Sequence, residues 1–261
     1  MIYAVGDIHG QKAQLDHALA LIAADGGPDA EIVFLGDYTD RGPDSKGVLD
    51  TLIDGRAAGR NWRFLMGNHD RFFSHWVQHG REHDPRVASG LSWLNPRLGG
   101  IATLASYGVT SDVEPTFARE EDGLEYLLGF QRGDRLMTPD DVQRDAQAAV
   151  PQSHLAFLDS LPLTIETDDL LFVHAGIKPG VPVADQDPED LLWIRQGFLD
   201  DTRDHGKLVV HGHTALDTPE HFGNRIDLDG GAGYGRPLVP AVFEGRDCFL
   251  LTPGGRQPLL P

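Results

Sequence analysis

The segment covering residues 35–42 constrains the fold of this chain most strongly. An apolar run, Ile32 to Leu35, ends in a glycine, and Asp37, Asp40 and Arg41 follow it. Such a run is typical of a buried strand that ends where polar side chains face a crevice. Two carboxylates beside a permanent cation can form an ordinary ion pair or part of a metal and phosphate site. This segment alone leaves both interpretations open.

The same arrangement recurs at four further points of the chain. Four other short apolar runs end in turns that carry Asp7 and His9, then Asn68 and His69, then His174, and finally His211 and His213. Apolar runs that alternate with segments of helical periodicity favour a parallel-stranded α/β core. Because the carboxyl ends of such strands share one edge of a sheet, we expect the polar residues of the five turns to meet at one site.

The length and composition predict a single domain over residues 1–261. A chain that is 40% hydrophobic can bury one large core at this length, and no linker marks a second domain. Residues 71–150 lack the strand and helix alternation and are expected to form a mainly helical insertion. Phe72, Phe73 and Trp76 fall at helical spacing at its start. We interpret this insertion as one that shapes the substrate cleft.

Three histidines in this insertion invite a metal-site interpretation. His75, His79 and His83 are spaced by four residues, which would align them on one face of a helix. Pro85 and the surrounding charges instead favour a solvated helix end. We therefore do not assign a metal to these histidines.

The charge balance limits the classes of partner. With 40 acidic against 22 basic residues, the net charge of −18 disfavours nucleic acids and anionic membranes as partners. A phosphate would have to be bound locally, where metal ions can supply positive charge. A motif already begins at Asp7 and no run approaches the ~18 apolar residues of a membrane helix. We expect a cytoplasmic protein, with Cys248 as a core residue rather than a nucleophile.

The chemistry of the expected site follows from its donor atoms. Its candidate metal ligands are Asp7, His9, Asp37, Asn68, His174 and His213. A mixed set of oxygen and nitrogen donors without thiolates suits Mn²⁺, Fe or Zn²⁺. Six ligands are too many for one tetrahedral ion, whereas two ions that share a carboxylate would use them all. Asp37, central in the order, is the best candidate for the shared ligand.

Five ordered motifs carry a resemblance to a known family. GDIHG at 6–10, GDYTDRG at 36–42, GNHD at 67–70, FVHAG at 172–176 and HGHT at 211–214 resemble the phosphoprotein phosphatase family of metallophosphoesterases. The resemblance implies an α/β fold, a four-layer αββα sandwich of two mixed β-sheets flanked by helices. It also implies hydrolysis of phosphate monoesters by a hydroxide that bridges two divalent transition-metal ions, with Mn²⁺ preferred and Fe or Zn²⁺ as alternatives.

The resemblance also assigns a role to each matching residue. By resemblance, Asp7 and His9 bind one metal, Asp37 bridges both, and Asn68, His174 and His213 bind the other. His69 resembles the general acid, held by Asp40, and Arg41 and Arg195 resemble the pair that clamps phosphate. A carboxylate on the second ring nitrogen is expected to fix the His69 tautomer and raise its pKa. The GHT motif points to His213 as ligand and leaves His211 in a supporting or structural role.

The substrate class stays open at this point. Residues 229–234 do not match the SAPNY segment of eukaryotic protein phosphatases, and Asp70 replaces the commoner glutamate. The motifs ending in Arg195 and Thr214 look like those of bacterial members, which include Ser/Thr phosphatases and symmetrical diadenosine tetraphosphatases. The substrate is thus expected to be a phosphorylated protein or a small phosphoester or nucleotide. A non-catalytic metal or phosphate sensor is less favoured, because the expected acid and clamp residues are all present.

Overall fold

The computed structural model describes residues 1–261 and contains two mixed β-sheets packed face to face. The first sheet has the strand order β14-β13-β12-β1-β2-β3. Its strands are β1 (Ile2–Val5), β2 (Ile32–Phe34), β3 (Trp62–Phe64), β12 (Ala241–Glu244), β13 (Asp247–Thr252) and β14 (Gly255–Pro258). Strands β1, β2 and β3 are parallel neighbours, whereas β12 pairs antiparallel with β1. The parallel part therefore directs the turns after β1, β2 and β3 to one edge.

The second sheet has the strand order β10-β11-β9-β8-β7. Its strands are β7 (Thr164–Glu166), β8 (Leu170–Val173), β9 (Leu208–His211), β10 (Glu220–His221) and β11 (Arg225–Asp227). Strands β8, β9 and β11 run parallel, and the antiparallel strands β7 and β10 lie at the edges. The turns after β8 and β9 consequently leave the sheet at one edge.

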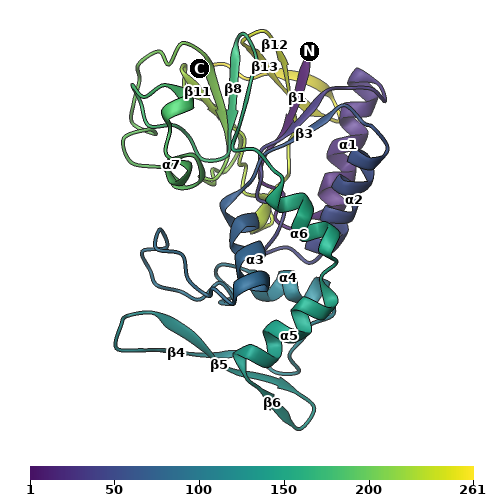
Figure 1. The fold of residues 1–261 in the computed structure, drawn as a ribbon. Coiled ribbons are helices and arrows are strands. Elements are labelled where there is room, and N and C mark those ends of the chain that lie inside the picture. The colour runs from purple at the N-terminus through teal and green to yellow at the C-terminus, as the bar shows by residue number, and fades with distance from the viewer.

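Alternation along each strand places helices outside the two sheets. In β2, Val33 packs between the sheets, while Ile32 and Phe34 pack in the cluster on the outer face, as the period of two requires. Helices α1 (Lys12–Gly26), α2 (Ser45–Ala57) and α6 (Gln152–Asp159) lie on this outer side (Figure 1). The second sheet is covered by the short helix α7 (Pro188–Trp193), the 3₁₀ turn η1 (Val183–Asp185) and irregular segments. The predicted four-layer sandwich is confirmed, with a thin fourth layer.

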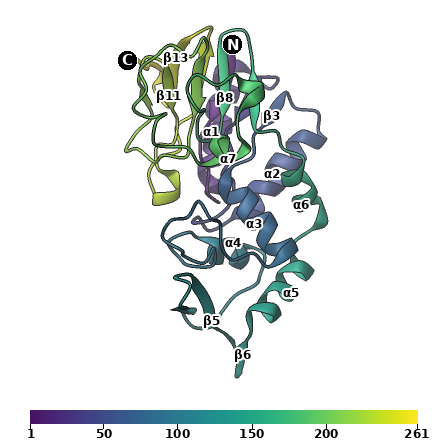
Figure 2. The ribbon, with the colours of Figure 1, turned by 60° about the vertical axis from the view of Figure 1, so that its left-hand side comes forward.

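The insertion at residues 71–150 contains strands as well as the expected helices. The segment holds α3 (Asn68–His79), α4 (Gly100–Ser106) and α5 (Pro139–Ala149), but also an antiparallel sheet of β4 (Thr116–Arg119), β5 (Glu125–Arg132) and β6 (Arg135–Met137). Aromatic residues favour this pairing, and Leu127 and Phe130 are buried beneath it. In two views this sheet lies at the end of the molecule remote from the sandwich (Figures 1 and 2). The single-domain organisation stays a prediction.

The three histidines of the insertion do not form a metal cluster. Helix α3 ends at His79, and Gly80 adopts the left-handed conformation that closes it. His75 and His79 lie with ring centroids 6.0 Å apart, whereas His83 lies beyond the helix and its Nε2 is 2.6 Å from the Glu125 carbonyl oxygen. The helix end separates His83 from the face that the other two share.

None of the helices combines the length and the apolar character that crossing a lipid bilayer requires.

Candidate active site

The five polar turns meet where the two sheets adjoin. From the first sheet come the turns after β1, β2 and β3, and from the second come those after β8 and β9. His174 Nε2, at the end of β8, lies 2.8 Å from Asn68 Oδ1 and 3.4 Å from Asp37 Oδ1. Residues more than one hundred positions apart in the sequence therefore share one site.

Two groups of metal-binding side chains share Asp37. The donor atoms of His9, Asp37 and His69 lie within 4.8 Å of one another, and so do those of Asp37, His174 and His213. The Asn68 Oδ1 atom joins the second group, 2.9 Å from His213 Nδ1. His69, expected to be the acid, thus takes part in the first group by distance.

Asp7 lies at the rim of the first group. Its carboxylate is 4.0 Å from His9 Nε2 and accepts the backbone N–H of His213 at 3.1 Å. Burial, followed by the charges of Asp229 and Asp37, raises the pKa of Asp7 well above its ordinary value. A cation beside these carboxylates would offset both the desolvation and the repulsion.

Backbone carbonyl groups set the tautomers of two histidines. His9 Nδ1 lies 2.8 Å from the Thr39 carbonyl oxygen, and His174 Nδ1 lies 2.9 Å from the Leu35 carbonyl oxygen. Because a carbonyl oxygen only accepts, each Nδ1 carries the proton and each Nε2 presents a lone pair to the site.

The donor set fits divalent metal ions. The lone pair of His174 Nε2 faces Asn68 Oδ1, another acceptor, and a cation held by both would satisfy them. In addition, His213 Nε2 is buried without a hydrogen-bond partner. Carboxylate, amide and imidazole donors in two groups with a common carboxylate match two ions that share one ligand.

Unusual backbone conformations are confined to this site. The non-glycine residues with positive φ are His9, Asp37, Asp40, Arg41 and His213. All are candidate site residues, and a left-handed conformation costs about 1–3 kcal/mol at such positions. Hydrogen bonds hold the strained turns together, since the Asp37 carbonyl accepts the backbone N–H groups of Ile8 and His9 at 3.0 and 2.8 Å. Strain of this kind gathers where function requires a fixed geometry.

His69 and Asp40 form a buried hydrogen-bonded pair. His69 Nδ1 lies 2.6 Å from Asp40 Oδ2, which also accepts from Trp93 Nε1 at 2.8 Å. Burial raises the pKa of Asp40 to about 7, although hydrogen bonds from Thr103 and Trp93 oppose this shift. Burial and then the Arg41 charge lower the pKa of His69 to about 3. The expectation of a raised His69 pKa is therefore wrong, because desolvation of the ring and the Arg41 charge outweigh the opposing charge of Asp37.

The two arginines line two cavities. Arg41 Nη1 is 2.5 Å from His9 Nε2, and its Nη2 is 3.0 Å from His69 Nε2. Arg195 Nη2 donates to the His213 carbonyl oxygen at 3.2 Å. Arg41, Arg195 and His213 line both a cavity of about 300 Å³ and one of about 400 Å³. An anion between the arginines would thus have space on two sides.

His211 lies behind the site. Its Nδ1 is 3.0 Å from the Gly212 carbonyl oxygen, and its Nε2 is 3.1 Å from Arg225 Nη1. Its ring packs edge-on against Phe198, with centroids 5.1 Å apart. The structure therefore places His211 in a packing role and His213 in the site.

Several residues that lie in the site had no individual role in the sequence-based expectations. They are Trp93, Thr103, Asp229, Gly233 and Tyr234. A Cβ atom on Gly233 would lie 2.6 Å from His9 Cδ2, and the Tyr234 ring lies 4.8 Å from the Arg41 guanidinium carbon. The mismatch at 229–234 was the sequence signal for this turn, whereas for Trp93 and Thr103 the sequence predicted only an insertion that shapes the substrate cleft.

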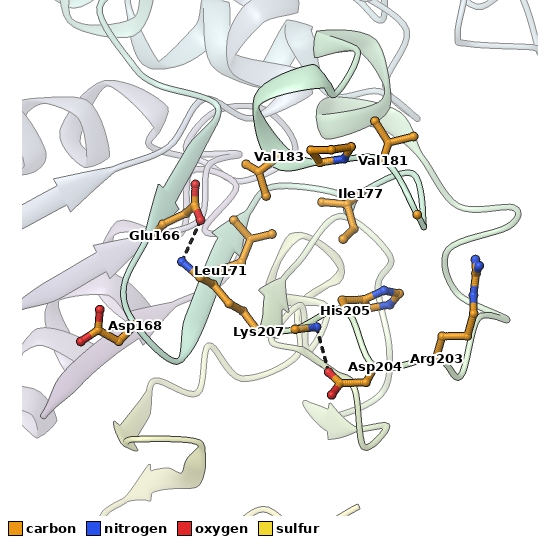
Figure 3. A pocket seen from close by; sticks show the side chains of 13 residues that line it. Glu166, Asp168, Leu171, Ile177, Val181, Val183, Arg203, Asp204, His205 and Lys207 are labelled. Atoms are coloured by element: carbon orange, nitrogen blue, oxygen red, sulfur yellow. Dashed lines mark hydrogen bonds and ion pairs between the residues drawn. The ribbon is translucent and has the colours of Figure 1, made fainter.

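A further cavity lies away from the candidate site. It has a volume of about 530 Å³, and its wall includes the apolar side chains of Leu171, Ile177 and Val183 (Figure 3). At its edge Lys207 Nζ is paired with Glu166 Oε2 at 2.8 Å. No residue of the two metal-binding groups lines this cavity, so we assign no chemistry to it.

Comparison with curated proteins identifies relatives of two kinds. The chain is 46% identical over 68 residues to the symmetrical bis(5′-nucleosyl)-tetraphosphatase of Janthinobacterium sp., but this match spans only 26% of the chain and 23% of that relative. It is 25% identical over 248 residues to the asymmetrical bis(5′-nucleosyl)-tetraphosphatase PrpE of Geobacillus thermodenitrificans, which covers 90% of the chain and 87% of that protein.

Solved structures with the same fold include phosphatases. A putative diadenosine tetraphosphatase superposes with a TM-score of 0.56 at 20% identity, covering 99% of this chain and 93% of that one. A cold-active protein tyrosine phosphatase superposes with a TM-score of 0.57 at 17% identity, covering 98% and 78%. At these identities the likeness is one of fold. The sequence model of the calcineurin-like phosphoesterases matches residues 1–236, and with this match over most of its length the chain belongs to the calcineurin-like phosphoesterase family.

Proposed function

We propose that this protein is a dinuclear metal-dependent phosphoesterase that hydrolyses phosphate monoesters, with phosphoserine and phosphothreonine in proteins as its first substrate class. The observation that carries the proposal is the position of Asp37, which belongs to both metal-binding groups. His69 and the two arginines line the same cavity as Asp37. Ligands, proton donor and anion-binding groups therefore occupy one cleft.

Each ion has its own ligands in this proposal. Asp7, His9 and Asp37 would hold one ion, and Asp37, Asn68, His174 and His213 would hold the other. Two bound cations lower the pKa of water and offset the negative charge of phosphate. Mn²⁺ is our choice for activation in vitro, since the hard and borderline donors include no thiolate.

The arginines and His69 act on the substrate in this scheme. Planar guanidinium groups match phosphate oxygens, so Arg41 and Arg195 would bind the phosphate on the cleft side. A phosphate that engages Arg41 brings negative charge next to His69, which raises the pKa of the ring. The His69 Nδ1–H would keep its hydrogen bond to Asp40 while Nε2 gives a proton to the departing oxygen.

A second candidate substrate is a dinucleoside polyphosphate. Arg41 and Arg195 line two cavities, which would leave space on both sides of a bound phosphate, as a phosphorus inside a polyphosphate chain requires. Tyr234 is exposed beside Arg41 and offers an aromatic surface for a base. The curated relatives that act on bis(5′-nucleosyl) tetraphosphates support this alternative.

One set of assays separates these readings. The purified protein is assayed with Mn²⁺ on a phosphoserine peptide, p-nitrophenyl phosphate and diadenosine tetraphosphate, before and after exhaustive chelation. We expect hydrolysis that requires two ions per chain, with the highest kcat/KM on the phosphopeptide. Unimpaired activity after chelation, or full activity with one ion, contradicts the dinuclear proposal. Preference for diadenosine tetraphosphate favours the second candidate.

A further inference from the structure

The Asp40 carboxylate is surrounded by donors that come from the insertion. Its Oδ2 atom accepts from Trp93 Nε1 at 2.8 Å as well as from His69, and its Oδ1 atom accepts from Thr103 Oγ1 at 2.8 Å. Asp40, Trp93 and Thr103 are all completely buried. An indole N–H can only donate, so Trp93 holds Oδ2 in one orientation.

Thr103 forms hydrogen bonds with both the side chain and the backbone of Asp40. Its hydroxyl donates to Oδ1 and accepts the Asp40 backbone N–H at 2.8 Å. The Ser45 hydroxyl, 3.0 Å away, can donate to the remaining lone pair of Thr103. This network holds Asp40 in its left-handed backbone conformation, at a φ of 73°.

Trp93 itself is held by packing. The centroid of its ring lies 5.1 Å from that of Trp76 and 5.8 Å from that of Phe73. Both residues belong to α3, the helix that begins with Asn68 and His69. Rings packed in this way have little rotational freedom, so the indole N–H is preorganised. The aromatic cluster of Phe73, Trp76 and Trp93 therefore fixes the position of Asp40 and, through it, that of His69.

We propose that Trp93 and Thr103 are positioning residues that hold the Asp40 carboxylate, and through it the His69 ring, in line with the leaving group. The inference rests on the proposed function, because it assigns proton donation to His69. It gives the segment from 93 to 103 a part in the reaction beyond shaping the cleft. A ring that loses this support keeps its proton but delivers it at a poor angle.

The first test removes the indole N–H while keeping an aromatic ring. Trp93→Phe should lower kcat about 10- to 100-fold on a phosphoserine peptide, the range seen when groups that orient a functional side chain are removed. The loss on p-nitrophenyl phosphate should be smaller, because that leaving group departs without a proton. KM and metal content should stay within about twofold of wild type.

Trp76→Phe is the matched control, since this ring packs on Trp93 without a hydrogen bond to Asp40. It should leave the ratio of the two rates unchanged. Thr103→Val and Thr103→Ser form a second pair, in which only the valine variant should show the leaving-group effect. If circular dichroism shows that Trp93→Phe does not fold, the two Thr103 variants test the proposal in its place. Equal losses on both substrates in Trp93→Phe and Thr103→Val overturn the proposal.

A measurement without substrate separates this inference from the proposed function. In ¹H–¹⁵N spectra of the imidazole groups, the His69 Nδ1–H resonance should shift in Trp93→Phe and in Thr103→Val but not in Trp76→Phe. An unchanged resonance overturns the positioning role whatever the activity. If wild-type protein hydrolyses no phosphate ester, the proposed function fails while this resonance still reports on Trp93 and Thr103.

Discussion

At the scale of single residues, the candidate site is fixed before any substrate arrives. The imidazoles of His9 and His174 are oriented by the Thr39 and Leu35 carbonyl oxygens. Asp37 sits at a φ of 52°, which hydrogen bonds from the neighbouring turn maintain. Preorganised ligands of this kind lose little entropy on binding ions and keep the reacting groups in place.

The phosphate clamp leads to a prediction for Arg195. Arg195→Ala should raise KM and lower kcat together, with a loss of about 10²-fold or more in kcat/KM, because a fixed cation acts on both bound phosphate and transition state. Steady-state kinetics on p-nitrophenyl phosphate measures both constants. Arg203→Ala is the matched control, since Arg203 pairs with Asp201 and lines the other cavity. Wild-type kinetics in Arg195→Ala would show that this arginine does not bind phosphate.

Proton donation and metal binding can be separated between two histidines. His69→Asn should retain both ions yet lose ~10²- to 10⁴-fold in rate on a serine-like leaving group, with a smaller loss on an acidic phenol. His174→Asn should instead lose metal, without such dependence as its main effect. Elemental analysis and rates on the two leaving groups test both variants. Loss of an ion from His69→Asn, or equal slowing of both substrates, would falsify the assignment of His69 as acid.

At the scale of elements, the turn that leads into α4 holds Arg41 of the proposed phosphate clamp in place. The Gly99 carbonyl oxygen accepts the Arg41 backbone N–H at 3.3 Å, and Thr103 on α4 holds the neighbouring Asp40. A Cβ atom on Gly99 would collide with the Arg41 backbone nitrogen. The start of α4 and the turn after β2 are therefore packed too closely for any side chain at Gly99.

Two glycines that flank α4 separate the effect of the close contact with Arg41 from the effect of backbone strain. Gly99 and Gly108 have φ values of 96° and 83°, but a Cβ atom on Gly108 would meet nothing within 4 Å. Gly108→Ala should cost about 1–2 kcal/mol of stability from backbone strain and keep kcat/KM unchanged. Gly99→Ala should cost more and also raise KM, because Arg41 must move. Thermal denaturation measures the loss of stability, and steady-state kinetics measures KM. Equal KM values in the two variants would argue against the contact between Gly99 and Arg41.

At the scale of the whole molecule, a strongly acidic protein gathers cations at one cleft. The net charge is −18, yet three arginines, Arg41, Arg195 and Arg236, line the cavity of about 400 Å³. The remainder of the surface repels polyanions, whereas this cleft would attract the phosphate of the proposed substrate through short-range contacts. In the proposed function a phosphorylated substrate therefore binds only at this cleft.

The single cysteine of the chain, Cys248, reports on opening of the core between the two sheets. Cys248 lies in the cluster between the two sheets and is 4% exposed, and burial raises the pKa of its thiol to about 12. A thiol reagent such as DTNB should therefore label native protein only through global unfolding, at a rate that rises with denaturant as the unfolded fraction does. Cys248→Ala supplies the background. Rapid labelling without denaturant would show that the core opens locally.

Local periodicity by itself indicated the strands that carry the candidate site. Short apolar runs ending in glycine predicted β1, β2 and β3, and runs ending in histidine predicted β8 and β9, because burial of a strand and its termination at a polar turn are encoded within a few residues. The antiparallel sheet of β4 to β6 was not foreseen, since its short strands carry mixed polarity and are stabilised by pairing with one another. Its strands are therefore decided by tertiary contact.

The residues of the candidate site likewise fall into those that the sequence predicted and those that only the tertiary structure brought together. The ordered motifs of the sequence include every residue of the two metal-binding groups, although His69 was expected as the acid, because each lies within a few residues of the end of a strand. Only the folded chain placed Trp93 and Thr103 on Asp40, over separations of 53 and 63 residues, and Gly233 against His9. The tertiary structure also decided the low pKa of His69, because desolvation depends on everything packed around the ring rather than on its sequence neighbours.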